Sequence, residues 1–259
     1  MPKASWHLDR RTVLRGAGLA PWVLGEIVGV EISPADAQRL GVAEGDRVRL
    51  ESPRGRMEAR ARIREIAQAL EDYRLAYQRI APEVDYVAIN ISSPNTPGLR
   101  KLQAPEFLKP ILEGLLELRK ELGLERQPLF VKLAPDLPFE ELDAIVEAIA
   151  ASGISGLIAT NTTLDRGIVS DRNRARVEAW GDGGLSGAGL YGKARAVRNR
   201  ILDRLPKALA FQACGGIGTA AQAAEALSDG AALVQVYSAL IFEGPGLVGE
   251  LNRGLAARS

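Results

Sequence analysis

The chain has 259 residues, of which 46% are hydrophobic and 25% are charged, so it can form one large α/β domain or a small domain beside a medium-sized one. Its 33 Lys and Arg against 32 Asp and Glu give a net charge of +1, which provides no global field to attract nucleic acid or an acidic surface. The single cysteine, Cys214, excludes an internal disulfide, and the single histidine, His7, argues against a histidine-based triad or a metal site.

The first 65 residues differ in pattern from the rest, and we expect them to form an N-terminal extension with a helix and short β segments. The stretch LDRRTVLRGAGLA at residues 8–20 is similar to the start of a twin-arginine export signal, but Glu26 interrupts the apolar stretch that should follow. A basic helical extension is an equal alternative.

Residues 30–63 predict a short helix, a Gly-Asp turn and two strands around a Pro-Arg-Gly turn. This stretch resembles a fragment of the C-terminal barrel domain of molybdopterin-dependent oxidoreductases. Roughly 34 residues are too few to form that barrel alone, so we assign no cofactor to them. Two unrelated partial patterns in succession suggest a mosaic chain.

From about Asp85 onward, short apolar runs of β type alternate with helical patterns. The β-type runs lie at 86–91, 129–133, 156–160, 209–213 and 233–237. The clearest helical patterns, at 108–115 and 142–149, place apolar residues three or four positions apart, and Gly123 and Gly153 are plausible ends for them. This alternation predicts βα units around a parallel sheet, with the polar residues after each strand gathered on one face.

Residues 163–191 are rich in Arg and Gly and only weakly periodic. The segment is long for a connection inside a compact domain. We therefore expect a loop that is either a functional lid or disordered.

The stretch NISSPNTPGLRKLQ at residues 90–103 resembles the signature of class 2 dihydroorotate dehydrogenases, which are flavin enzymes of pyrimidine synthesis built on a (β/α)8 barrel. Further matching motifs follow in the same order: VKLAPDL at 131–137, ATNTTLDR at 159–166, GGLSG at 183–187, GGIG at 215–218 and ALVQVYSALIFEGPGL at 232–247. The resemblance covers about residues 66–254, and the ordered set is far more specific than any one motif. It implies an α/β fold like a TIM barrel for residues 66–259, incomplete because only about five βα units are visible.

The resemblance implies the oxidation of dihydroorotate to orotate, with FMN as cofactor and a quinone-type acceptor. The reaction removes a proton from one ring carbon and passes a hydride from its neighbour to the flavin. By resemblance, Ser93 is the base, and it relays the proton to water because an isolated hydroxyl is a poor base. The substrate-binding residues that the resemblance implies are Asn90, Asn95, Asn161 and Thr162. Neutral amides suit an imide-like ring, since each offers a donor and an acceptor.

By the same resemblance, the FMN-binding residues are Asn90, Lys132, Thr160, Gly187, Gly216, Tyr237 and Ser238. Lys132 would lie beside the flavin edge that gains negative charge on reduction. The last four would hold the phosphate end, as in other barrels whose phosphate sites follow the last two strands. Gly216 also precedes a helical run at 219–227, whose N–H groups can face an anion.

Each of these residues has a simpler structural role as an alternative. Ser92, Ser93 and Asn95 could cap the next helix or form Asx turns, and Lys132 could extend to solvent. The glycine motifs could be tight turns, and Cys214 is expected to be a small buried residue. The ordered occurrence of the motifs favours the functional interpretation.

Several features of the family are not visible before Asp85, including a flavin-contacting Gly-Phe-Asp-Lys type of motif and the helices that bind quinone. In addition, Ala188 stands where the family usually has proline. An open five-stranded sheet would expose an apolar edge, which favours a homodimer or a completing partner.

The alternative function is therefore a non-catalytic, truncated or chimeric half-barrel that retains only a flavin- or phosphate-binding face. A related flavin barrel that acts on dihydropyrimidines fits less well, because by resemblance it has Cys where Ser93 stands. Because the family that the chain resembles works at the cytoplasmic face of the membrane, we expect a cytoplasmic location, with peripheral association at that membrane as one alternative and export as another. No apolar run reaches the ~18 residues of a membrane span.

Overall fold

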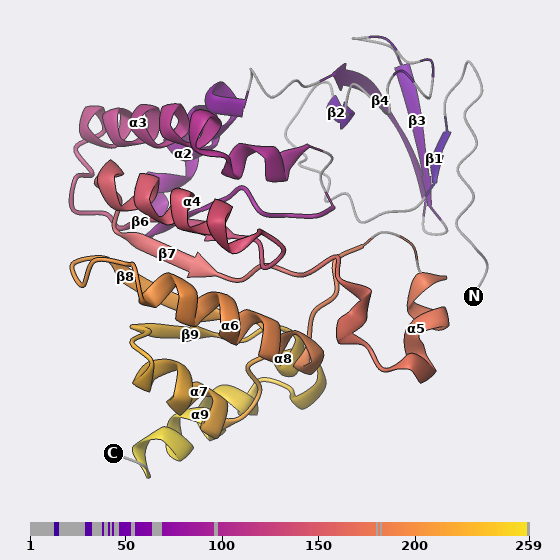
Figure 1. Ribbon diagram of the computed structural model, residues 1–259. Helices are drawn as coiled ribbons and strands as arrows, with labels where there is room; N and C mark the ends of the chain where they lie inside the picture. Colours follow the sequence, from indigo (N-terminus) through magenta and orange to yellow (C-terminus); the bar gives the residue numbers. More distant parts are fainter. Residues whose placement is uncertain are drawn as a thin grey trace. The chain divides into compact units, whose positions relative to one another are not determined.

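A computed structural model describes residues 13–15, 29–32, 38, 41, 43, 47–52, 55–63, 69–95, 98–179, 181 and 183–257 of the chain. Backbone contacts divide the chain into two compact units, Met1–Ala69 and Leu70–Ser259. Each unit has a sheet of its own (Figure 1).

The described part of the first unit is a four-stranded sheet in the order β1-β3-β4-β2. The strands are β1 (Val13–Arg15), β2 (Gly29–Ile32), β3 (Arg47–Ser52) and β4 (Gly55–Ile63). The antiparallel pairing of β3 with β4 confirms the two strands predicted around the Pro-Arg-Gly turn. Residues 13–15 pair with β3 as a parallel strand, so the basic helix considered for this stretch is wrong at these positions, where strand pairing satisfies the backbone groups. Arg10, Arg11 and most of the predicted short helix lie outside the described residues.

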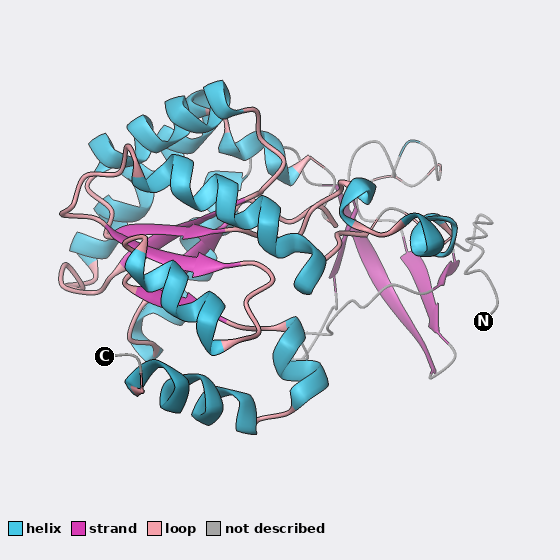
Figure 2. Cartoon of the chain, turned by 60° about the horizontal axis from the view of Figure 1, so that its bottom comes forward, coloured by secondary structure: helices cyan, strands magenta, loops and turns pink. Residues whose placement is uncertain are grey.

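The second unit contains a five-stranded parallel sheet in which sheet order follows chain order, β5-β6-β7-β8-β9. The strands are β5 (Val87–Asn90), β6 (Leu129–Leu133), β7 (Gly156–Ala159), β8 (Ala210–Cys214) and β9 (Leu233–Gln235). Most helices of this unit pack around the sheet (Figure 2). The five parallel strands confirm the predicted α/β architecture, and the described residues of this unit contain fewer strands than the eight of a closed barrel.

The α-helices of this unit are α2 (Ala69–Ile80), α3 (Pro105–Glu121), α4 (Phe139–Ser152), α5 (Asp171–Glu178), α6 (Tyr191–Leu202), α7 (Ala220–Ser228), α8 (Ser238–Glu243) and α9 (Gly246–Ala256). Short 3-10 turns lie at η2 (Ala81–Glu83), η3 (Leu99–Gln103), η4 (Arg166–Ile168) and η5 (Ala188–Leu190). As predicted, α3 and α4 bury the apolar residues of 108–115 and 142–149. Gly153 ends α4 at φ 88, a left-handed conformation that favours glycine. None of the described helices combines the length and the apolar character that crossing a bilayer requires.

The segment 163–191 is not a continuous loop, because it contains α5 between η4 and η5. Only Val177 of α5 is buried, and most of the helix is polar and exposed. A helix without an apolar stripe has no periodicity to reveal it, so the loop prediction is wrong for Asp171–Glu178.

Candidate functional site

A cavity of about 690 Å³ opens where the carboxyl ends of β6, β7, β8 and β9 meet the loops that follow them. Its volume lies within the range of roughly 300–1,000 Å³ that small-molecule and cofactor sites occupy. The predicted site residues that line the cavity are Lys132, Thr160, Asn161, Thr162, Gly187, Gly216, Tyr237 and Ser238. Asn90, Ser93 and Asn95 lie outside the set of residues that line it.

Lys132 brings a positive charge to the cavity wall from near the end of β6. Its Nζ lies 3.5 Å from Oε1 of Gln235 and 3.8 Å from Sγ of Cys214, on β9 and β8. Nε2 of Gln235 donates to Oε1 of the buried Gln212 at 2.7 Å, which orients the Gln235 acceptor toward the lysine. Cys214 is only partly buried and lines the cavity, so the expectation of a buried core residue is wrong. Cys214 is the last residue of β8, at the strand end where the cavity opens.

The Thr160 side chain is a buried polar group without an internal partner. Thr160 is 1% exposed, and its Oγ1 makes no hydrogen bond within the described structure. A buried unpaired hydroxyl costs on the order of 1–3 kcal/mol. Because Thr160 lines the cavity, a bound molecule can supply the missing partner.

Glycines allow backbone segments to approach closely at one end of the cavity. Gly216 adopts φ 73, and a Cβ there would lie 2.5 Å from N of Tyr191 and 2.8 Å from O of Gly187. The hydroxyl groups of Ser186 and Ser238 face each other at 2.8 Å. These hydroxyls and the side-chain-free backbone form a set of small neutral groups suited to an anion such as a phosphate.

The N-terminus of α7 is partly satisfied by its own capping box. The N–H of Gln222 donates to Oγ1 of Thr219 at 3.2 Å, and Oε1 of Gln222 accepts from the N–H groups of Gly218 and Thr219. The N–H groups of Gly218, Thr219 and Gln222 therefore already have partners within the chain. The prediction that the N–H groups after Gly216 face an anion is wrong for these three residues.

An amide cluster joins the ends of β5 and β7. Oδ1 of Asn90 accepts from Oγ of Ser92 at 3.0 Å and from Nδ2 of Asn161 at 3.1 Å. Nδ2 of Asn161 also donates to Oγ of Ser92 at 3.0 Å, and its Oδ1 accepts from the N–H of Thr162 at 2.8 Å. The Asn90 amide nitrogen makes no hydrogen bond within the described residues, so it is the free donor of this cluster.

Tyr73 supports this cluster from α2, because its hydroxyl donates to the main-chain oxygen of Asn90 at 2.9 Å. Burial, with a smaller contribution from the charge of Asp72, raises the pKa of Tyr73 to about 12. The phenol therefore remains a donor at neutral pH.

Ser93 takes part in a local turn next to the amide cluster. Its Oγ accepts from the N–H of Asn95 at 3.3 Å, as one of the structural alternatives supposes, and Oδ1 of Asn95 accepts from the N–H of Gly184 at 3.3 Å. The helix-cap alternative is not seen, because α3 has Ala104 at its N-cap position. Ser92, by contrast, is fully buried and belongs to the amide cluster, a role that sequence reasoning missed.

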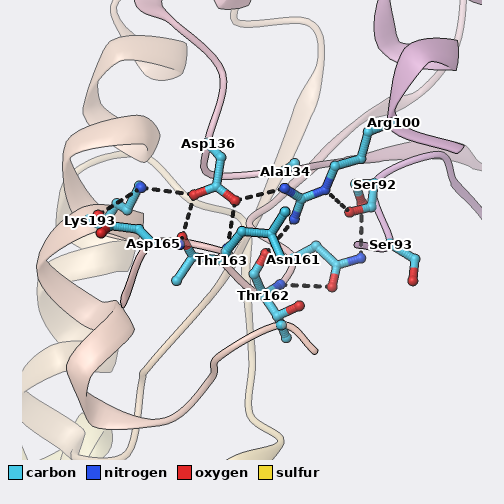
Figure 3. Close-up of polar contacts among 12 residues, drawn as sticks. Ser92, Ser93, Arg100, Ala134, Asp136, Asn161, Thr162, Thr163, Asp165 and Lys193 are labelled. Atoms are coloured by element: carbon cyan, nitrogen blue, oxygen red, sulfur yellow. Dashed lines mark hydrogen bonds and ion pairs between the residues drawn. The ribbon is translucent and has the colours of Figure 1, made fainter. Parts of the chain in front are cut away.

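A charged cluster, also missed by sequence reasoning, surrounds Asp136 in the loop after β6 (Figure 3). The Asp136 carboxylate accepts hydrogen bonds from Arg100, Lys193, Thr163 and the N–H of Leu164. Burial alone would raise the pKa of Asp136, but the hydrogen bonds from Lys193 and the other donors lower it to about 2 from the ordinary 3.8. The carboxylate is therefore ionised throughout the physiological pH range.

Residues 47–258 match the family model described as dihydroorotate dehydrogenase, and residues 19–69 match that of the molydopterin dinucleotide binding domain. A relative from Xanthomonas oryzae pv. oryzae, named dihydroorotate dehydrogenase (quinone), is 41% identical over 194 residues, which cover 74% of this chain and 54% of the relative. A relative of the same name from Kineococcus radiotolerans is 44% identical over 192 residues, or 74% of this chain and 52% of the relative.

Two solved structures of DHODH from Eimeria tenella are also similar. The complex with ferulenol has a TM-score of 0.66 and 30% identity, and the alignment covers 75% of this chain and 56% of that chain. The ligand-free type has a TM-score of 0.67 and 31% identity, with 75% and 58% covered. The chain thus spans about half the length of the curated relatives that it matches.

Proposed function

Because the chain belongs to the dihydroorotate dehydrogenase family, we propose that residues 66–259 bind FMN and oxidise dihydroorotate to orotate in pyrimidine synthesis, with a quinone-type acceptor. The observation that carries this proposal is the unpaired hydroxyl of Thr160 in the wall of the cavity, beside the charge of Lys132. A cavity of this size whose lining includes an orphaned hydroxyl, Lys132 and Glu243 suits a polar, aromatic cofactor.

The residues of the cavity fit FMN. Thr160 and Lys132 offer hydrogen-bond donors at the strand ends, while Gly187, Gly216 and Ser238 offer the small groups suited to its phosphate end. When bound, FMN supplies the hydride acceptor of the reaction. The Lys132 ammonium stabilises negative charge that develops in the cavity, and Gln212 and Gln235 hold it in position without adding a charge.

The amide cluster recognises the pyrimidine ring. Asn90 presents its free amide nitrogen, and Asn161 is held in one orientation by Asn90, Ser92 and the N–H of Thr162. Asn95 completes the substrate-binding set from the turn that contains Ser93. Fixed neutral amides orient an uncharged ring without the desolvation cost of a buried charge.

Ser93 removes the ring proton and passes it to water. The N–H of Asn95 donates to Oγ of Ser93, and such a bond stabilises negative charge on the oxygen while the proton moves on. Dihydroorotate is oxidised first, and the quinone then accepts the two electrons. A cytoplasmic protein in peripheral contact with the membrane has access to such a lipid-soluble acceptor.

The alternative is a non-catalytic half-barrel that holds FMN or its phosphate end without turnover. The exposed edge of the sheet favours it, since Leu233 of the edge strand β9 is 57% exposed. A homodimer or a completing partner would cover this apolar surface.

The test is an absorbance spectrum of the purified chain from ~350 to 500 nm, before and after anaerobic dihydroorotate. Flavin bands that bleach on addition support the oxidation, and unbleached bands support the non-catalytic alternative. Thr160→Val is the matched variant, because it removes the hydroxyl and keeps the shape. It should weaken FMN binding about tenfold, as expected for one lost hydrogen bond of ~1.4 kcal/mol. A protein that stays colourless after incubation with added FMN contradicts the proposed oxidation and favours the non-catalytic half-barrel.

A further inference from the structure

Arg100 connects three of the loops that follow the parallel strands. From η3, its Nε donates to the main-chain oxygen of Ser92 at 3.1 Å, beyond β5. Its Nη1 donates to Oδ2 of Asp136 at 2.7 Å, beyond β6, and its Nη2 donates to the main-chain oxygen of Thr162 at 2.9 Å, beyond β7. One side chain thus joins the rims of three successive strands (Figure 3).

The two carbonyl acceptors lie next to residues with proposed chemical roles. Ser92 directly precedes Ser93, and Thr162 directly follows Asn161. A guanidinium is planar and holds its donors in a fixed fork, so it sets the distance between groups that bind its separate nitrogens. A lysine at the same place carries the same charge but cannot hold three acceptors in one plane.

The third partner, Asp136, anchors the guanidinium. The Arg100 and Asp136 side chains are 21% and 20% exposed, so solvent competes little for their contact. Lys193 of α6 binds the other carboxylate oxygen of Asp136 at 2.8 Å and binds Asp165 at 3.1 Å. The carboxylate is therefore fixed from α6 and from the loop after β7, and it presents a stationary acceptor to Arg100.

We propose that Arg100 is a positioning residue, which holds the Ser93 turn and the Asn161–Thr162 segment at one separation. The consequence for turnover rests on the proposed oxidation of dihydroorotate, whereas the consequence for loop order does not. Arg100 does not itself line the cavity, although it binds the main-chain oxygen of Thr162, which does. It acts through the main-chain oxygens that it binds.

The test compares the full chain with Arg100→Lys, and with Arg200→Lys as the matched control. Arg200 is a partly buried arginine on α6, away from the strand-end loops. Two nitrogens of its guanidinium bind the carboxylate of Asp143 on α4. Hydrogen exchange is measured over residues 91–95, 162–165 and 210–228. We expect Arg100→Lys to speed exchange at least tenfold in the first two segments and to leave the third unchanged, while Arg200→Lys changes none of them.

The kinetic arm measures the anaerobic bleaching of bound FMN at saturating dihydroorotate. Arg100→Lys should lower the maximal rate at least tenfold while the FMN dissociation constant stays within twofold, a split that a general loss of structure would not produce. If Arg100→Lys does not fold, Asp136→Asn replaces it, and faster exchange is then expected in 91–95, which hydrogen bonds of the described residues connect to Asp136 through Arg100.

Two results overturn the inference. Exchange that is unchanged in both loops shows that Arg100 does not hold them. Faster exchange with an unchanged maximal rate shows that it orders the loops without positioning the reaction. If the unaltered chain fails to bleach FMN, the proposed function fails, and the exchange measurement alone decides whether Arg100 positions the loops.

Discussion

Replacing Gly216 by alanine tests the glycine-lined end of the cavity most directly. A Cβ at this position would lie 2.5 Å from N of Tyr191 and 2.8 Å from O of Gly187. These neighbours are backbone atoms, so the first turn of α6 or the loop before it must move. We therefore expect both the stability of the chain and its affinity for FMN to fall.

The matched control is Gly153→Ala. Gly153 has φ 88, similar to the φ 73 of Gly216, but an added Cβ there meets nothing within 4 Å. Both variants carry the cost of a side chain in the left-handed region, roughly 1–2 kcal/mol. Only Gly216→Ala adds the overlap, which costs about 1–3 kcal/mol in a packed site. The difference between the two variants isolates the close approach of Gly216 to the backbone of residues 187–191.

The assay is thermal unfolding together with FMN titration. Relative to Gly153→Ala, Gly216→Ala should unfold about 2–12 °C lower, since 1 kcal/mol corresponds to roughly 2–4 °C for a domain of this size. It should also bind FMN at least tenfold more weakly, a loss of about 1.4 kcal/mol, while Gly153→Ala binds normally. Equal unfolding temperatures and equal FMN affinities in the two variants would refute the reasoning.

Three further predictions concern the chemistry and the pH dependence. Ser93→Ala should slow the bleaching of bound FMN by dihydroorotate about 100-fold or more, the usual range for a general base. The affinity for FMN should not change. A bleaching rate equal to that of the unaltered chain would show that Ser93 is not the base. Lys132→Met should lower the two-electron reduction potential of bound FMN by about 30 mV, or ~1.4 kcal/mol, in a redox titration, and an unmoved potential would contradict its electrostatic role. The pKa of Asp136 is lowered from 3.8 to about 2, so its stabilisation is complete above pH 4 and is lost as the pH falls toward 2. Acid unfolding should show a loss of about 2 kcal/mol over this window that Asp136→Asn lacks, and identical acid profiles would exclude this assignment.

The fold was predictable where local pattern and tertiary environment agree. β6 has its predicted bounds, Leu129–Leu133, because its four apolar residues are buried as in the strands of a parallel sheet, while Lys132 lines the cavity. β9 ends two residues earlier than predicted, since Tyr237 already caps α8 and Val236 connects the two elements. α5 escaped detection because its sequence, DRNRARVE, has only Val177 to bury.

The candidate site was predictable only in part, for a physical reason. The order of the motifs indicated which residues would gather at the strand ends, because parallel topology brings those ends to one face. It could not indicate that Arg100 binds acceptors 36 and 62 positions away. A charged side chain can pair with many partners of opposite charge, and only the folded backbone selects one of them. For the same reason, sequence alone did not separate Ser92, buried in the amide cluster, from Ser93 in the turn.

The agreement between sheet order and chain order bears on how the second unit is built during synthesis. Every strand from β5 to β9 pairs only with the strand just before or just after it in the chain, so no later strand has to insert between two that are already paired. At ~5–20 residues per second, the roughly 150 residues from β5 to β9 take on the order of 10–30 s to leave the ribosome. Over that time the nascent sheet has one stationary edge at β5 and one advancing edge. Among the described residues, β9 with its exposed Leu233 is the last strand to join that advancing edge.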